Sequence, residues 1–182
     1  MVWLKNDIIR LRALEPKDLD VLYEWENDSS LWRDGCTLSP FSRYVLSKYI
    51  AETQQDIYSE HQLRLLICDN KHHIPIGAVD LYDFDPHNRR AGIGIMIATP
   101  YQRQGFGIHA LKLIQQYAFF FLHINQLYAF ISTRNTKSIS LFEKCNFIES
   151  GHLKKWLMTE QGYTDALLFQ CINEKPSDFS LG

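Results

Sequence analysis

The chain has 182 residues, of which 46% are hydrophobic and 22% are charged, and its formal net charge at pH 7 is -2. These values fit a single globular domain with a substantial core. They give no electrostatic basis for a nucleic-acid-binding protein, which would present a concentrated basic face. The four cysteines lie far apart and form no C-x-x-C pair, so the sequence predicts neither a zinc site nor a redox motif.

The sequence also lacks the marks of a membrane protein. Residues 1–10 contain no apolar segment of the kind found in signal peptides, and the most apolar run, residues 117–122, is far too short to span a bilayer. We therefore expect a cytoplasmic protein that has no membrane partner.

The first predicted elements are a strand and a helix. Residues 8–14 alternate apolar and basic side chains, which is typical of a half-buried strand. Pro16 then suits the first turn of a helix, whose apolar stripe begins at Leu19. Three carboxylates gather at the end of this helix, namely Glu24, Glu26 and Asp28. Carboxylates there oppose the helix dipole, so a functional role and a solvated acidic surface are both open interpretations.

The next segment predicts a second helix and an antiparallel meander. The helix is expected over residues 42–53, and the three strands over residues 63–68, 76–84 and 90–98. Residues 69–73 read as a hairpin turn that contains two histidines. Since no third ligand follows at a useful spacing, we interpret this segment as an exposed polar turn and not as a metal site.

A glycine-bearing loop follows the third strand of the meander and enters a long helix. A loop in this position exposes backbone N–H groups that have no partner within the helix, and the helix dipole favours an anion beside them. Gly105 and Gly107 carry no side chain that would block a ligand, and Gln102 could add a neutral donor. The loop therefore predicts a diphosphate site, although glycines that only permit a tight turn would give the same pattern.

The second half of the chain is predicted to contain helix 106–122, strand 126–132, helix 136–145 and a hairpin of strands 147–156 and 163–171. The strand before the first of these helices and the strand after it should form a right-handed parallel crossover. Phe119 and Phe120 widen the apolar face of the long helix. They could mark the contact of a homo-oligomer or be buried within one domain.

Two blocks of the sequence resemble motifs of the GNAT N-acetyltransferase superfamily. Residues 102–107, QRQGFG, match that family's Q/R-x-x-G-x-G/A loop, which holds the diphosphate of acetyl-coenzyme A. Residues 135–147 are similar to its N-x-x-[SA]-x-x-[LI]-[YF]-E-K-x-G-F block. Residues 80–91, with 11–15 and 162–165, resemble the branch that contains spermidine acetyltransferases and ribosomal-protein N-terminal acetyltransferases.

The resemblance implies a fold and an activity. The fold would be a single mixed α/β GNAT domain over residues 8–172, with a mixed six- to seven-stranded sheet flanked by about four helices and a polar tail over residues 173–182. The activity would move the acetyl group of acetyl-coenzyme A, the co-substrate, to a polyamine or another small primary amine by direct transfer in a ternary complex, without a metal. Alternatives are a protein N-terminal acetyltransferase and a catalytically weak sensor of coenzyme A or acetyl-coenzyme A.

The resemblance also implies which residues hold the co-substrate. They are Ile95, Met96, Ile97, Gln102, Arg103, Gln104, Gly105, Phe106, Gly107, Asn135, Ser138 and Lys144. The strand over residues 95–97 would supply a backbone N–H to the oxyanion of the tetrahedral intermediate. Asn135, which we also count as catalytic, would bridge the pantetheine arm and an active-site water. Ser138 and Lys144 could contact the diphosphate or the 3′-phosphate.

Proton transfer and acceptor binding are assigned to a separate set. Strand alternation predicts Asp80 and Asp83 on opposite faces of the sheet, so only one of them can face the site. We favour Asp83 as the base, because it resembles a position in the acidic acceptor pocket of spermidine acetyltransferases. Tyr82 and Glu26 are further candidates for acceptor binding, and all these acids could instead be solvated surface charges.

Three positions depart from the family pattern. Asn146 stands where glycine is usual, and asparagine tolerates the left-handed conformation. Gly92 replaces a common glutamate, which removes one candidate base. Phe142 stands at the catalytic position where relatives have a tyrosine acid. A thiol has a pKa of about 8.5, so its thiolate leaves without help and the loss of the acid should slow transfer without abolishing it.

Overall fold

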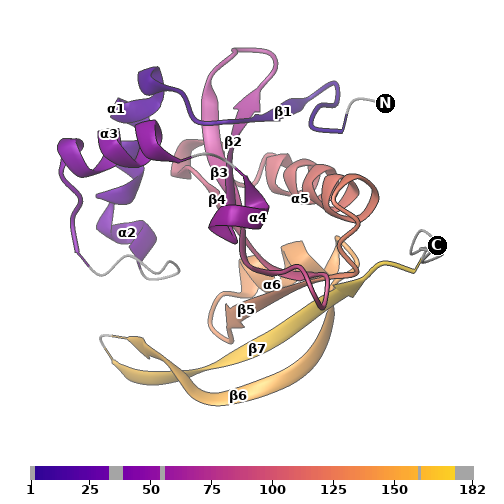
Figure 1. Cartoon of the computed structure of the whole chain (residues 1–182). Coiled ribbons are helices and arrows are strands. Elements are labelled where there is room, and N and C mark those ends of the chain that lie inside the picture. The colour runs from indigo at the N-terminus through magenta and orange to yellow at the C-terminus, as the bar shows by residue number, and fades with distance from the viewer. Residues whose placement is uncertain (1–2, 33–38, 54–55, 160, 175–182) are drawn as a thin grey trace.

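Seven strands form one mixed sheet in the described part of the computed structural model, which covers residues 3–32, 39–53, 56–159 and 161–174 (Figure 1). The strand order is β1-β2-β3-β4-β5-β7-β6. The bounds are β1 Ile9–Arg12, β2 Leu63–Asp69, β3 Pro75–Asp85, β4 Arg90–Ile97, β5 Gln126–Ser132, β6 Ile148–Thr159 and β7 Gly162–Ile172. Within these residues the predicted α/β class, with a mixed sheet of six to seven strands, is confirmed.

Helices cover both faces of the sheet. Their bounds are α1 Leu19–Glu26, α2 Ser29–Trp32, α3 Arg43–Glu52, α4 Ile57–Glu60, α5 Phe106–Gln116 and α6 Thr136–Glu143, with short 3-10 turns at Pro16–Asp18 and Thr99–Tyr101. The larger core cluster joins one face to α5 and α6, and a smaller cluster joins the other face to α1 and α3. The sheet therefore has an α5 face and an α1 face.

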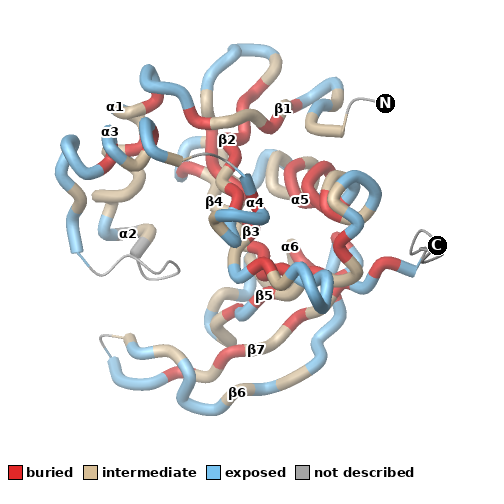
Figure 2. The backbone as a smooth tube through the Cα atoms, in the orientation of Figure 1, coloured by how far each residue is buried: buried red, intermediate tan, exposed pale blue. Residues whose placement is uncertain are grey.

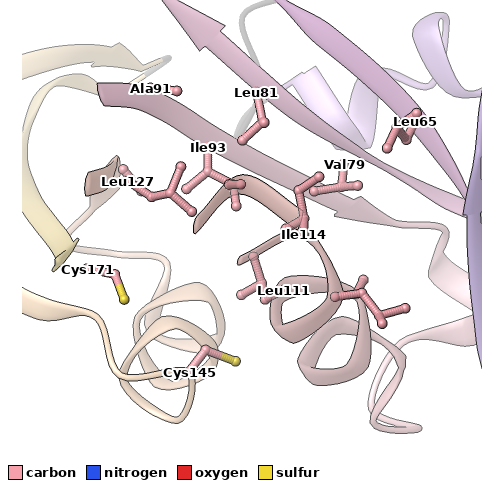
Figure 3. Packing of buried hydrophobic residues seen from close by; sticks show 14 of the residues in the cluster. Leu65, Val79, Leu81, Ala91, Ile93, Leu111, Ile114, Leu127, Cys145 and Cys171 are labelled. Carbon is pink, nitrogen blue, oxygen red and sulfur yellow. The ribbon is translucent and has the colours of Figure 1, made fainter. Parts of the chain in front are cut away.

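The larger cluster shows why the chain folds in this way. Leu65, Val79 and Ile93 stand on three neighbouring strands and face Leu111 and Ile114 of α5 (Figure 3). Their spacing follows the two-residue period of a strand and the 3.6-residue period of a helix, so each element buries one side. Figure 2 shows the result, with buried positions concentrated along the central strands and the inner side of α5, and with β6 largely exposed.

Strands β4 and β5 pair over a short length and then diverge. Their parallel pairing covers three rungs, from Arg90 opposite Gln126 to Gly92 opposite Tyr128. Beyond that point β4 pairs with β3 as far as Ile97, while β5 pairs with β7 as far as Ser132. We call the opening between the diverging parts of β4 and β5 the fork. Since α5 connects β4 to β5, the parallel arrangement of the predicted crossover is confirmed.

Some predicted boundaries were wrong for local reasons. The strand predicted over residues 8–14 ends at Arg12, whose guanidinium turns to the carboxylate of Asp18 with N–O distances of 2.6 and 2.8 Å. The short helices α2 and α4 were not predicted, because a single turn is shorter than the periodicity on which the prediction rests. Most of the predicted tail, residues 173–182, lies outside the described residues.

The helix predicted over residues 106–122 also changes type before its end. After Gln116 it continues as a π-helix over Tyr117–Phe121. Phe119 packs against the main core, whereas Phe120 is 47% exposed and stacks on Trp3 with ring centroids 6.2 Å apart. The two phenylalanines therefore have different environments, and a contact between subunits through Phe120 stays a prediction.

Candidate active site

The inner edge of β4 carries backbone groups that point into the fork. The N–H of Ala98 donates to the carbonyl of Ile76 on the β3 side, at 2.9 Å. Because hydrogen-bonding direction alternates along an antiparallel strand, the backbone groups of Met96 also face β3, and those of Ile95 and Ile97 face the fork. The side-chain amide of Gln102 confirms this direction, since its Nε2 donates to the carbonyl of Ile97 at 2.9 Å.

The loop after β4 is held in a conformation that exposes backbone donors. Arg103 and Gly105 both have positive φ, at 62° and 85°. The backbone N–H groups of residues 103–107 donate no hydrogen bond to another described residue, and these residues lead into the first turn of α5. Such an array beside a helix N-terminus suits a phosphate group. The chain can therefore hold a diphosphate here with backbone donors.

The two glycines of this loop have different environments. A Cβ built on Gly105 would meet no other atom within 4 Å, whereas one built on Gly107 would lie 3.1 Å from Leu141 of α6. Gly105 is thus favoured by its left-handed backbone, and Gly107 by the close packing of α5 on α6. The expected open space and the alternative of a tight turn therefore both fit Gly105, whereas the packing role of Gly107 was not predicted.

The start of α6 lies at the end of β5. Asn135 caps the helix, because its side-chain oxygen accepts a hydrogen bond from the N–H of Ser138 at 3.0 Å. Phe142, further along the helix, is 2% exposed and packs edge-to-face on Phe147 with ring centroids 4.9 Å apart. Asn146 has a φ of 64°, so the predicted left-handed conformation is confirmed.

Tyrosines cover the base of the fork on the α1 face. Tyr82 on β3, Gly92 on β4 and Tyr128 on β5 lie side by side in the sheet register. The Tyr82 ring covers Gly92 so closely that a Cβ there would lie 2.2 Å from its Cε2 atom. The rings of Tyr82 and Tyr128 meet edge-to-face at 6.2 Å. Burial and, next, the negative charge of Asp83 raise the pKa of Tyr128, so its hydroxyl stays protonated at neutral pH.

A salt-bridged triad lies on the same face, one step further along β3. Arg64 donates through Nη1 to Glu26 at 2.6 Å and through Nε to Asp80 at 2.6 Å. Burial opposes the charge of this guanidinium, but the carboxylate of Asp80 and then that of Glu26 outweigh burial and raise the pKa of Arg64. Arg64 therefore keeps its positive charge between the two carboxylates.

A bulge in β3 corrects the predicted arrangement of the two aspartates. Pairing with β4 is interrupted between Tyr82 and Asp85, and Asp83 has a φ of 48°. Leu81 and Phe84, three residues apart, consequently pack into the same core cluster. Strict alternation fails here, so it no longer decides whether Asp80 and Asp83 lie on opposite faces, and that arrangement stays a prediction. Asp83 is exposed, and its side chain forms no hydrogen bond or ion pair with another described residue.

The chain matches a known protein family over most of its length. The family model for the acetyltransferase (GNAT) domain matches residues 9–148. The chain belongs to the GNAT acetyltransferase family. As a GNAT protein it is an acetyl-coenzyme A-dependent N-acetyltransferase.

Individual GNAT relatives agree with this assignment. The spermidine N(1)-acetyltransferase of Vibrio cholerae is 25% identical over 178 residues, which cover 93% of this chain and 96% of the relative. An N-acetyltransferase 9-like protein of Nematostella vectensis is 41% identical over 153 residues, covering 78% and 75%. A crystal structure of the Vibrio cholerae spermidine enzyme with coenzyme A and spermine has a TM-score of 0.82 at 26% identity, covering 92% of this chain and 96% of that one.

Most residues predicted to hold the co-substrate are brought together by the GNAT fold. The backbone of Ile95 and Ile97 lines the fork, residues 102–107 form the loop at the end of the same strand, and Asn135 caps the helix after β5. Met96 differs, because its backbone faces β3. Lys144 is exposed at the far end of α6, next to Cys145, whose sulfur approaches the Ile108 carbonyl in the first turn of α5 at 4.0 Å.

Two residues of the site were not predicted from the sequence. Arg64 reads as one polar position in a strand, and Tyr128 as part of an apolar run. Their roles depend on partners that are distant in sequence, Glu26 and Asp80 for Arg64 and Tyr82 for Tyr128. The fold as described contains no helix long and apolar enough to cross a membrane, and its described residues form no group of three or more potential metal ligands.

Proposed function

We propose that the protein transfers the acetyl group of acetyl-coenzyme A directly to a primary amine, a polyamine or another small amine, within a ternary complex. The observation that carries this proposal is the fork. Its edge offers the backbone N–H groups of Ile95 and Ile97, and the loop of residues 102–107 lies at the end of the same strand. A diphosphate on that loop would leave the pantetheine arm free to enter the fork.

The chemistry divides among several groups in this proposal. The N–H of Ile95 or Ile97 stabilises the oxyanion of the tetrahedral intermediate. An alkyl amine attacks only when it is neutral, and its pKa is about 10, so a base must remove a proton at neutral pH. Asp83 is that base, and Asn135 orients the pantetheine arm. The phenylalanine at position 142 has no proton to give, so the coenzyme A thiolate leaves without an acid from α6.

A cationic acceptor fits the charge of the α1 face. Glu26 and Asp80 place two carboxylates there against the guanidinium of Arg64, and the negative charge of Asp83 acts on Tyr128 of the same face. Relatives that acetylate spermidine support a polyamine, and the same net charge would also suit the amino terminus of a protein. Acetylation of a protein amino terminus is therefore the alternative to acetylation of a small amine.

Thiol release from acetyl-coenzyme A tests the proposal. Spermidine, spermine, a simple monoamine and short peptides are supplied separately, and the acetylated product is identified by mass spectrometry. We expect turnover with at least one amine. Turnover with peptides alone would replace the small-amine assignment by the protein N-terminal alternative. Calorimetric binding of coenzyme A without transfer to any of these amines would refute the activity and favour the sensor alternative.

A further inference from the structure

We propose that Tyr82 is a catalytic residue that carries the proton of the attacking amine from the fork toward Asp83. This inference rests on the proposed function and names the path by which its proton leaves. Tyr82 was predicted only to contact the acceptor.

The position of the Tyr82 ring carries the argument. The atoms nearest to a Cβ built on Gly92 are Cε2 at 2.2 Å and Cζ at 2.5 Å, and Cε1 lies 3.9 Å from a Cβ built on Gly94. These atoms form the phenolic end of the ring. The side chain therefore reaches from β3 across β4, and its hydroxyl lies over the strand whose other edge opens into the fork. Gly92 belongs to the last rung that joins β4 to β5, so the ring stands at the base of the fork.

The neighbouring carboxylates indicate where the proton can go. Glu26 and Asp80 both accept hydrogen bonds from Arg64 at 2.6 Å, so protonating either one would break an ion pair. Asp83 follows Tyr82 in the chain and lies in the bulge. Its exposed carboxylate forms no ion pair with another described residue. Its charge also acts on Tyr128, whose ring meets that of Tyr82. Asp83 is therefore the acid group that can receive a proton from this pair of tyrosines and return it to solvent.

The step balances in atoms and charge. The acceptor ammonium first loses one proton along this path, from its nitrogen to the Tyr82 oxygen and from the Tyr82 hydroxyl to Asp83, which releases it to solvent. The neutral amine nitrogen then forms a bond to the thioester carbon, and the carbonyl electron pair moves to oxygen. The nitrogen then gives a proton to the Tyr82 oxygen while the Tyr82 hydroxyl proton passes, through Tyr128 or a water, to the Asp83 carboxylate. The intermediate collapses as the carbon–sulfur bond breaks, and the electron pair leaves with sulfur. The thiolate takes a proton from solvent, and Asp83 returns one to solvent.

Substitutions that keep the ring and remove only the hydroxyl test this path. Tyr82→Phe retains the packing over Gly92, so its thermal unfolding should match that of the unaltered protein. Its kcat should fall at least about 10-fold, since acid–base groups typically contribute about 100-fold or more, while KM for acetyl-coenzyme A stays the same. Asp83→Asn should have an effect of similar size. Tyr44→Phe, at a 68% exposed position on α3, is the matched control and should leave kcat unchanged.

The double variant Tyr82→Phe/Asp83→Asn separates a shared path from two independent effects. Groups that act in one proton path are not additive, so the double variant should be no slower than the slower single variant. Multiplied losses, or an unchanged kcat in Tyr82→Phe, would overturn the role of Tyr82. Absence of acetyl transfer by the unaltered protein is a different result, because it would refute the proposed function itself.

Discussion

Replacing Arg64 with methionine is expected to destabilise the fold and to create a binding site for a cation. The guanidinium bonds both Glu26 and Asp80, and the three side chains are only 18% to 29% exposed. Methionine keeps the apolar stem of the side chain but removes the guanidinium that donates hydrogen bonds to both carboxylates.

The magnitude follows from this burial. Breaking a buried ion pair costs about 3–5 kcal/mol, and partial exposure of the triad places the expected loss at about 3 kcal/mol. For a domain of this size each kcal/mol lowers Tm by about 2–4 °C, so Tm should fall by about 6–12 °C. A polyamine ammonium between the two carboxylates would restore part of this loss. At 100 times its Kd, it would contribute about 2.7 kcal/mol.

Thermal unfolding with and without spermidine measures both effects. Spermidine should raise the Tm of Arg64→Met more than that of the unaltered protein. The matched control is Arg43→Met. It removes a salt bridge between Arg43 and Asp20, whose side chains are 55% and 79% exposed, so its Tm should stay close to that of the unaltered protein. Equal unfolding of Arg64→Met and the unaltered protein, or an equal response of both to spermidine, would refute the reasoning about the triad.

Three further expectations concern glycines and one buried acid. Gly105→Ala should lower the free energy of unfolding by about 1–2 kcal/mol, because alanine is strained at a φ of 85°, and it should weaken coenzyme A binding. Gly107→Ala should change the free energy of unfolding by less than about 1 kcal/mol. Equal unfolding free energies of the two variants would contradict this expectation. Gly92→Ala should destabilise the fold by about 1–3 kcal/mol, because the new methyl group collides with Tyr82. Adding Tyr82→Ala to this variant should recover part of the loss, as measured by denaturant unfolding. Additive losses in the double variant would contradict the collision. Burial raises the pKa of Asp18, but hydrogen bonds from the Arg12 guanidinium and from the Glu15 backbone N–H lower it overall. The ionised Asp18 therefore stabilises the fold above about pH 4, and this stabilisation is lost as the pH falls. Asp18→Asn should lower the free energy of unfolding by about 3 kcal/mol at pH 7. In urea unfolding, its stability should fall less steeply with decreasing pH, and an unchanged pH dependence would argue against this role of Asp18.

The sequence was most informative where one periodic pattern decides an element. The strand predicted over residues 126–132 has those bounds in the structure, and α3 begins directly after Ser42, whose hydroxyl caps the helix. Both elements bury one face, so their periods survive in the order of apolar residues. Terminal and single-turn elements carry too few residues to show a period, which is why β1 was predicted too long and α2 was not predicted.

The site was predictable to the extent that its parts follow one another in the chain. The loop of residues 102–107 and the cap at Asn135 each occupy a few consecutive residues, so motifs could identify them. The triad of Arg64 joins three elements and leaves no local pattern. The bulge after Tyr82 depends on a pairing shift across two strands, and it removes the basis of the inference that alternation allowed about Asp83.

Three glycines around the fork show why a motif alone does not reveal function. The backbone angle of Gly105 and the Tyr82 ring over Gly92 disfavour any larger residue, whereas Gly107 has only a mild contact with the Leu141 side chain. Only Gly105 leaves the space above it open, so of these three it alone is free to serve a ligand directly. Gly92 appears in sequence as the loss of a glutamate. In the fold, the absence of a side chain at Gly92 leaves the space in which the ring of Tyr82 crosses β4 at the base of the fork.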